Sequence, residues 1–249
     1  MCGRYTETQA FERLQEQFLE WFNDASADPP FQPRYNIAPG QDAPVILTQG
    51  SSRQLKLLRW GLVPFWARDA RTGYKMINAK AETLAEKAAY RKAFERRRCL
   101  ALADGFYEWK KAGTLRAPYR FIVNDGEPFA FAGLWERWRK PDDTELQTFT
   151  IITTEPNDLV RSVHVRMPAI LPRSAYEPWL DSEFSDTAQL QMLLRPYPAK
   201  DMKGYPVSLL VNSPRNDTPE CIAPAPPELN LDMAIKPRLG AGPDELRSE

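Results

Sequence analysis

Apolar residues near the start of the chain recur with the spacing of one helical face. They are separated by three or four residues, and Thr6 stands upstream, where its hydroxyl could cap the first turn. The residues that share this face are Phe11, Leu14, Phe18 and Phe22. The pattern predicts an amphipathic helix that packs these side chains against a core.

Further along the chain, short apolar and β-branched runs predict strands. Residues 43–48 and 54–60 flank the turn-forming segment Gln49–Ser52, so we expect a hairpin there. A turn is also expected at residues 124–126, where the sequence reads Asn-Asp-Gly between two later runs. The other predicted strands cover residues 99–103, 119–123, 129–134, 149–154 and 207–211.

A second helix is predicted where Thr83-x-x-Glu86 has the form of a capping box. The helix is expected to end at the basic cluster 96–98, whose positive charge complements a helix C-terminus. Helical patterns return at residues 174–180 and 185–194. Helices and strands are interspersed without a βαβ rhythm, so the expected fold class is α+β.

Proline marks the irregular parts of the chain. Residues 28–33 form a proline-rich stretch that predicts a loop. From Pro214 onward prolines are dense enough to exclude regular helix or strand for most of the segment. We therefore expect one domain over residues 2–226 and a flexible C-terminal tail over residues 227–249.

Composition limits the choice of partners and cofactors. The chain has 249 residues, and 33 Lys and Arg balance 33 Asp and Glu, so any nucleic-acid binding must come from a local basic groove. Three cysteines and a single histidine form no C-x-x-C or histidine pair, so we expect no metal site, no cofactor and no disulfide framework. This cysteine usage suits a reducing cytosol. No apolar run approaches ~18 residues, so we expect a cytoplasmic protein without a membrane span.

Cys2 follows Met1 directly, and this position gives it unusual chemistry. Removal of Met1 would place an α-amino group and a thiol on neighbouring carbons, which makes a 1,2-aminothiol. A free α-amine titrates near ~7.7–8.0 and a thiol near ~8.5, so both supply some nucleophile at neutral pH. Such a pair traps aldehydes.

Six short segments combine polar residues with apolar, strand-like surroundings. They are Met1–Tyr5, Arg34–Pro39, Trp60–Trp66, Ile77–Thr83, Ala103–Trp109 and His164–Leu171. In these segments the chain resembles the SOS response associated peptidase (SRAP) family of abasic site processing proteins, and the resemblance covers roughly residues 2–226. It implies a mixed, largely antiparallel, partly barrel-like sheet flanked by helices.

The resemblance also implies a role in the DNA damage response. Such a protein senses abasic sites in single-stranded DNA and captures them, through Cys2, as a thiazolidine crosslink that protects the lesion. By resemblance Glu108 shuttles protons during Schiff-base formation, and His164 acts as a general acid toward the sugar oxygen. Asn78 positions the sugar or a water molecule. The catalytic residues implied are thus Cys2, Asn78, Glu108 and His164.

A second set of residues is expected to contact DNA. Arg4, Lys80 and Arg166 would bind phosphates, while Trp66 and Trp109 would offer flat faces to bases or a wedge at the lesion. Asn36 would line the same pocket. The full DNA-binding set is Arg4, Asn36, Trp66, Lys80, Trp109, Thr153 and Arg166.

The chain departs from the family pattern at two positions. Lys80 stands where the family usually has Arg, and a lysine cannot reproduce the planar fork that arginine offers to phosphate. Val165 stands where the family commonly has Asp after its histidine. If that Asp orients the imidazole, its loss leaves the tautomer of His164 to be set by another group.

Two other functions fit the same residues. A Cys nucleophile with His164 and an Asn or Glu is also the set found in a cysteine peptidase or an N-terminal nucleophile hydrolase, which would explain self-removal of Met1. A noncovalent reader of single-stranded or modified DNA would use Trp66 and the arginines alone. A Schiff base would also permit lyase chemistry at the abasic site. We expect a monomer.

Overall fold

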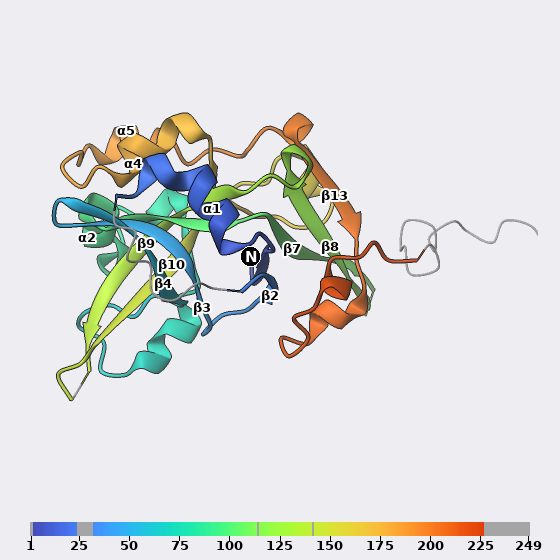
Figure 1. Ribbon diagram of the computed structural model, residues 1–249, viewed down its shortest axis with the longest axis horizontal. Coiled ribbons are helices and arrows are strands. Elements are labelled where there is room, and N and C mark those ends of the chain that lie inside the picture. The colour runs from blue at the N-terminus through green and yellow to red at the C-terminus, as the bar shows by residue number, and fades with distance from the viewer. Residues whose placement is uncertain (1, 24–31, 114, 141, 227–249) are drawn as a thin grey trace, which may run out of the picture.

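The computed structural model describes residues 2–23, 32–113, 115–140 and 142–226. The proposed tail at 227–249 and most of the proline-rich stretch at 28–33 lie outside these ranges. In the described part, two sheets lie side by side with helices around them (Figure 1). None of the helices in these ranges has the length and apolar character needed to cross a membrane.

Five strands close into a barrel in the order β10-β4-β3-β6-β9, because β9 also pairs with β10. Their bounds are β3 (Asp42–Gln49), β4 (Ser52–Trp60), β6 (Arg98–Ala103), β9 (Phe129–Arg139) and β10 (Glu145–Thr154). The short strands β5 (Asn78–Lys80), β11 (Met167–Pro168) and β12 (Ile170–Leu171) extend this sheet. Only the pairs β10–β4 and β10–β5 are parallel among the described pairings, so the prediction of a mixed, largely antiparallel, partly barrel-like sheet is confirmed.

A second, antiparallel sheet carries the N-terminus, in the order β13-β8-β7-β1-β2. Its strands are β1 (Arg4–Glu7), β2 (Arg34–Ile37), β7 (Gly105–Ala112), β8 (Leu115–Val123) and β13 (Met202–Pro206). Asp104 alone separates β6 of the barrel from β7 of this sheet. The chain therefore passes from one sheet to the other next to β1.

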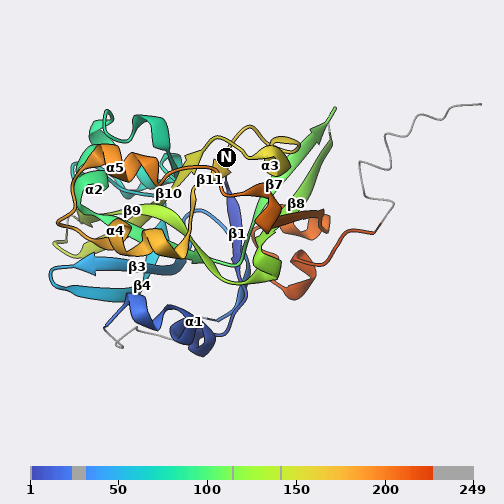
Figure 2. The ribbon, with the colours of Figure 1, turned by 90° about the horizontal axis from the view of Figure 1, so that it is seen from above.

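The described helices are α1 (Phe11–Phe18), α2 (Ala88–Arg96), α3 (Asp158–Arg161), α4 (Tyr176–Leu180) and α5 (Thr187–Met192). Helices α2 and α4 pack against the barrel strands β9 and β6, whereas α3 lies against β13 of the second sheet (Figure 2). The predicted face of α1 is confirmed, since Leu14 and Phe18 are fully buried with Tyr176 and Trp179 in one core cluster. The helix begins after Ala10, however, and not after Thr6, whose hydroxyl binds Asp104 inside β1.

Local signals gave the wrong start for α2. Thr83 ends a short 3-10 helix, and its buried hydroxyl has no hydrogen-bond partner among the described residues, so the predicted capping box is wrong. Arg98 was predicted to lie in the basic end of this helix. It lies in β6 instead, and its side chain binds the C-terminal end of α2. Its Nη1 donates to the carbonyls of Phe94 and Glu95, at 2.9 and 2.7 Å, and burial lowers the pKa of Arg98 to about 10.

The strand predicted at residues 207–211 is also wrong. The strand in this region is β13, and Leu209–Asn212 forms a 3-10 helix. The Ser208 hydroxyl accepts a hydrogen bond from the Leu210 amide at 3.3 Å, which favours a turn over an extended chain.

Candidate active site around Cys2

Cys2 lies immediately before β1 and inside the core. Its side chain is fully buried, and its Sγ is 3.7 Å from the Arg4 carbonyl oxygen. Burial raises the pKa of the Cys2 thiol well above its usual range, and the negative charge of Glu108 raises it further. The thiol is therefore neutral at pH 7 and needs a base before it can act as a nucleophile.

Glu108 is brought to Cys2 by the pairing of β1 with β7. Arg4 lies opposite Tyr107 in this register, so Cys2 enters β1 next to Glu108, whose charge acts on the Cys2 thiol. The Glu108 side chain is only 3% exposed, and burial raises its pKa to about 7. A carboxyl group with this pKa exchanges its proton at neutral pH.

His164, in the loop after α3, stands next to Glu108. Its Nδ1 is 3.8 Å from Glu108 Oε1 and 3.1 Å from the backbone N and O atoms of Arg166. Burial lowers the pKa of His164 below 6.5, so the ring is neutral at pH 7. If the Arg166 N–H donates to Nδ1, the proton of the neutral ring is on Nε2; a protonated Nδ1 would instead donate to the Arg166 carbonyl.

Asn78 holds the backbone on the other side of Cys2. It begins β5, which pairs in parallel with β10, and its Nδ2 donates to the Cys2 carbonyl at 2.7 Å. Its Oδ1 is buried and accepts no hydrogen bond from the described residues. The four residues named as catalytic from the sequence thus lie around one point, although they come from four separate segments.

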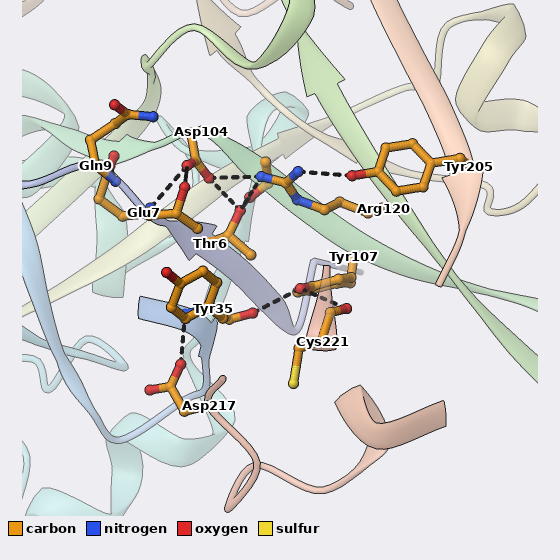
Figure 3. A network of polar contacts seen from close by, with 12 residues as sticks. Thr6, Glu7, Gln9, Tyr35, Asp104, Tyr107, Arg120, Tyr205, Asp217 and Cys221 are labelled. Atoms are coloured by element: carbon orange, nitrogen blue, oxygen red, sulfur yellow. Dashed lines mark hydrogen bonds and ion pairs between the residues drawn. The ribbon is translucent and has the colours of Figure 1, made fainter. Parts of the chain in front are cut away.

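A buried polar network holds the far end of β1 in place (Figure 3). The Asp104 carboxylate accepts hydrogen bonds from the hydroxyls of Thr6 and Thr8, from the Thr8 amide at 2.9 Å and from Arg120 Nη2 at 3.0 Å. Arg120 also donates to the Tyr205 hydroxyl at 2.9 Å, which ties in β13. Because β1 leads directly from Cys2, this network fixes the position of the thiol.

Two of the predicted DNA contacts are engaged inside the protein. Arg4 Nη1 donates to Asn36 Oδ1 and to the Val211 carbonyl, both at 2.8 Å. Asn36 is fully buried, and its Nδ2 donates to the carbonyls of Ser213 and Asn216 at 3.0 and 2.7 Å. This geometry fits a role in holding the C-terminal segment against β2, and direct DNA contact by either residue stays a prediction.

The other predicted contacts lie nearer the surface, apart from Thr153. Lys80 is exposed at the end of β5, opposite the fully buried Thr153 of β10. Trp66 is 56% exposed, so its ring face is open to a base. Trp109 is half-buried, and its Nε1 donates to Asn212 Oδ1 at 2.7 Å. Arg166 forms a double hydrogen bond with Glu82.

The sequence did not point to the roles of Glu82 and Asp104. Asp104 precedes a glycine between two strands, a pattern typical of a turn, and its partner Arg120 is 16 residues away. Glu82 is 84 residues from Arg166, so no local spacing connects them. Among the described residues, no group of three or more His, Cys, Asp or Glu side chains could hold a metal ion.

Comparison with known proteins relates the chain to one family. The family model described as SOS response associated peptidase (SRAP) matches residues 1–214. The abasic site processing protein YoqW of Bacillus subtilis (strain 168) is 46% identical over 223 residues, which are 89% of this chain and 99% of YoqW. HMCES of Gallus gallus, also an abasic site processing protein, is 33% identical. The match covers 96% of this chain and 84% of HMCES. A crystal structure of a protein from Bacteroides thetaiotaomicron superimposes with a TM-score of 0.78 at 26% identity, over 90% of this chain and all of that one.

Proposed function

We propose that this chain, which belongs to the SOS response associated peptidase family, captures abasic sites in single-stranded DNA through Cys2. One observation carries the proposal: a buried cysteine at the N-terminus stands beside a glutamate whose pKa is raised to about 7. The names of its relatives, abasic site processing proteins, support the same substrate.

The chemistry begins once Met1 has been removed. The α-amine of Cys2 adds to the aldehyde carbon of the open-chain sugar, and the carbonyl oxygen leaves as water to give an imine. The Cys2 sulfur then bonds to the imine carbon, and the thiol proton ends on the nitrogen. Because both nucleophiles belong to one residue, closure of the five-membered thiazolidine is intramolecular and gains an effective molarity of ~10⁵ M or more.

Glu108 and His164 divide the proton transfers between them. With a pKa of about 7, Glu108 can take a proton from the amine or thiol and return it to the departing oxygen. His164 is mostly neutral at pH 7, and its imidazolium fraction can give a proton to the sugar oxygen as the ring opens, which leaves the imidazole neutral. Both groups can therefore take part in proton transfer at neutral pH.

Burial of the thiol supports this order of events. A neutral, fully buried Cys2 is a poor nucleophile toward chance electrophiles. It reacts once an imine is held next to it and Glu108 can accept its proton. Asn78 keeps the Cys2 carbonyl fixed through its Nδ2, and its buried Oδ1 is an acceptor for a sugar hydroxyl or a water molecule.

The surface residues supply affinity in this proposal. Lys80 is placed to bind a phosphate, and the exposed ring of Trp66 can stack on a base. The protein acts as a monomer on intracellular DNA. The same imine permits β-elimination of the sugar, so lyase activity is a side branch of the reaction.

A peptidase acting on other proteins ranks second. Cysteine peptidases use a thiolate of lowered pKa, whereas burial raises the pKa of Cys2. The peptide cleavage that we include in the proposal is removal of Met1, which opens the aminothiol.

Denaturing gel electrophoresis of the Met1-processed protein with a single-stranded oligonucleotide carrying one abasic site tests the proposal. We expect a stable adduct that is absent with Cys2→Ala and with an intact oligonucleotide. Cys2→Ser keeps the amine, so it should give an adduct only after borohydride reduction. No adduct from a protein whose free Cys2 terminus is confirmed by mass spectrometry would contradict covalent capture.

A further inference from the structure

Glu82 and Arg166 form the best-aligned ion pair close to the site. Glu82 belongs to the 3-10 helix Ala81–Thr83 that follows β5. Arg166 Nη1 donates to Glu82 Oε1 at 2.7 Å and Nη2 donates to Oε2 at 3.0 Å. The Arg166 side chain is 16% exposed, and its hydrogen bonds hold the pKa of Glu82 below the usual value.

The same guanidinium is also fixed to the barrel. Nη2 donates to the Thr153 carbonyl at 2.5 Å, so three of the five N–H groups of Arg166 have protein partners. The carboxylate of Glu82 occupies the edge of the guanidinium formed by Nη1 and Nη2. This is the edge that would otherwise donate two parallel hydrogen bonds to a phosphate. The Arg166 side chain is therefore arranged to hold its own loop, with this edge bound to Glu82.

The loop that Arg166 holds contains His164. The backbone N and O atoms of Arg166 are each 3.1 Å from His164 Nδ1, and Thr153 pairs with Pro168 just beyond the loop. The side chain of Val165 is 76% exposed, so it points away from this arrangement. The backbone of Arg166 takes the orienting role that a carboxylate after the histidine would have.

We propose that Glu82 is a positioning residue for His164. By clamping the Arg166 side chain against β10, Glu82 holds the Arg166 backbone so that its N–H, and not its carbonyl, binds Nδ1; the proton of the neutral ring then stays on Nε2, where it can hydrogen-bond the sugar oxygen. The inference rests on the proposed function for the use of that proton. The position of the proton itself can be measured without DNA.

Other charges also face the imidazole and must be held constant in the test. Glu108 lies 3.8 Å from Nδ1, while Lys111 and the amino-terminal ammonium group lower the pKa of His164. Removing the charge of Glu82 acts on the ring through Arg166. We therefore expect it to change the tautomer of His164 while Glu108, Lys111 and the amino terminus stay as they are. All measurements therefore compare variants at one pH, above the pKa of the ring.

His164 is the single histidine of the chain, which makes the tautomer readable by ¹⁵N NMR of histidine-labelled protein. We expect the wild type to show the Nε2–H form, and Glu82→Gln to show a mixture of both forms. Glu82→Asp, which keeps the charge, should restore most of the wild-type signal. Arg166→Lys keeps the backbone amide but loses the fork, so it should give the same mixture as Glu82→Gln.

The chain provides a matched control in a second forked pair. Arg53 binds Glu177 of α4 through two hydrogen bonds of 2.7 and 2.6 Å, and Glu177→Gln should leave the His164 spectrum unchanged. In single-turnover capture, Glu82→Gln should lower the rate by about tenfold or more without weakening oligonucleotide binding, because the freed edge of Arg166 can still bind a phosphate.

An unchanged tautomer in both Glu82→Gln and Arg166→Lys would overturn the inference, as would a defect confined to Kd. If the tautomer changes in Glu82→Gln but the wild-type protein forms no adduct with DNA, the positioning role of Glu82 stands and the proposed function fails. The two ideas therefore fail separately.

Discussion

Two buried carboxyl groups four residues apart behave in opposite ways. Asp104, between the two sheets, receives hydrogen bonds from two hydroxyls and an amide and pairs with the buried Arg120. Glu108, in β7, stands near a neutral histidine, and burial raises its pKa to about 7. The first carboxylate stabilises the fold, whereas the second is held where it can exchange a proton.

The difference between Asp104 and Glu108 follows from the groups that surround each carboxylate and not from how far each is buried. Both side chains are at most 3% exposed. A charge taken out of water must be compensated by a partner and hydrogen bonds, and Asp104 has this compensation. For Glu108 the desolvation is the dominant influence, so the protein keeps a carboxyl group that is half protonated near pH 7.

Removing the fully compensated carboxylate should have the largest effect on stability. Asp104→Ala leaves Arg120 buried without its partner, and we expect it to lower the free energy of unfolding by about 3–5 kcal/mol. Urea unfolding measures this change. The matched control is Lys203→Met, which removes an exposed pair with Asp125 and should cost less than about 1 kcal/mol. Equal losses in the two variants would contradict a structural role for Asp104.

Glu108→Gln should separate stability from function. Because the folded-state pKa of about 7 exceeds the ordinary value of 4.5, the stability provided by the wild-type residue falls as the pH rises from 4.5 through 7. Gln does not ionise, so at pH 8 the variant should be more stable than wild type, by up to about 3 kcal/mol. Its capture rate should fall by about 10²- to 10⁴-fold. A variant that is both less stable and fully active would refute this assignment.

The parts of the fold that follow local patterns could be predicted from the sequence. The face of α1 and the hairpin of β3 and β4 depend on the spacing of neighbouring residues, and both are confirmed. The capping box at Thr83 failed because the preceding residues are held in β5 by β10, from a distant part of the chain. Closure of the barrel through β4 and β10 has no local signal either.

The site shows the same division. Cys2, Asn78, Glu108 and His164 were named through resemblance to a family, and the structure gathers them. No pattern revealed that Glu82 binds Arg166, since that pairing exists only after β5 and β10 have come together.

A smaller effect is expected on DNA affinity. Lys80→Arg adds a planar fork at an exposed position and should strengthen oligonucleotide binding or leave it unchanged. Lys80→Ala should weaken binding and reduce the salt dependence of log K by about 0.7 per lost phosphate contact. Titrations at several salt concentrations measure both. Clear weakening by Lys80→Arg would argue against a phosphate at this position.

The smallest effect is expected at Val165. Because the side chain is exposed and the Arg166 backbone already contacts His164 Nδ1, Val165→Asp should change the activation free energy of capture by no more than about 0.5 kcal/mol. A large gain in single-turnover rate would mean that the imidazole lacks an orienting partner in this chain.

The central claim is that Glu108 exchanges the protons that let Cys2 close on an abasic aldehyde. The most direct test is the single-turnover rate of adduct formation from pH 5 to 9, for Met1-processed wild type and Glu108→Gln. We predict a rise in the wild-type rate with an inflection near pH 7, the pKa of Glu108, and a variant that keeps only the inflection of the Cys2 α-amine near ~7.7–8.0. An identical profile in both proteins would contradict this claim.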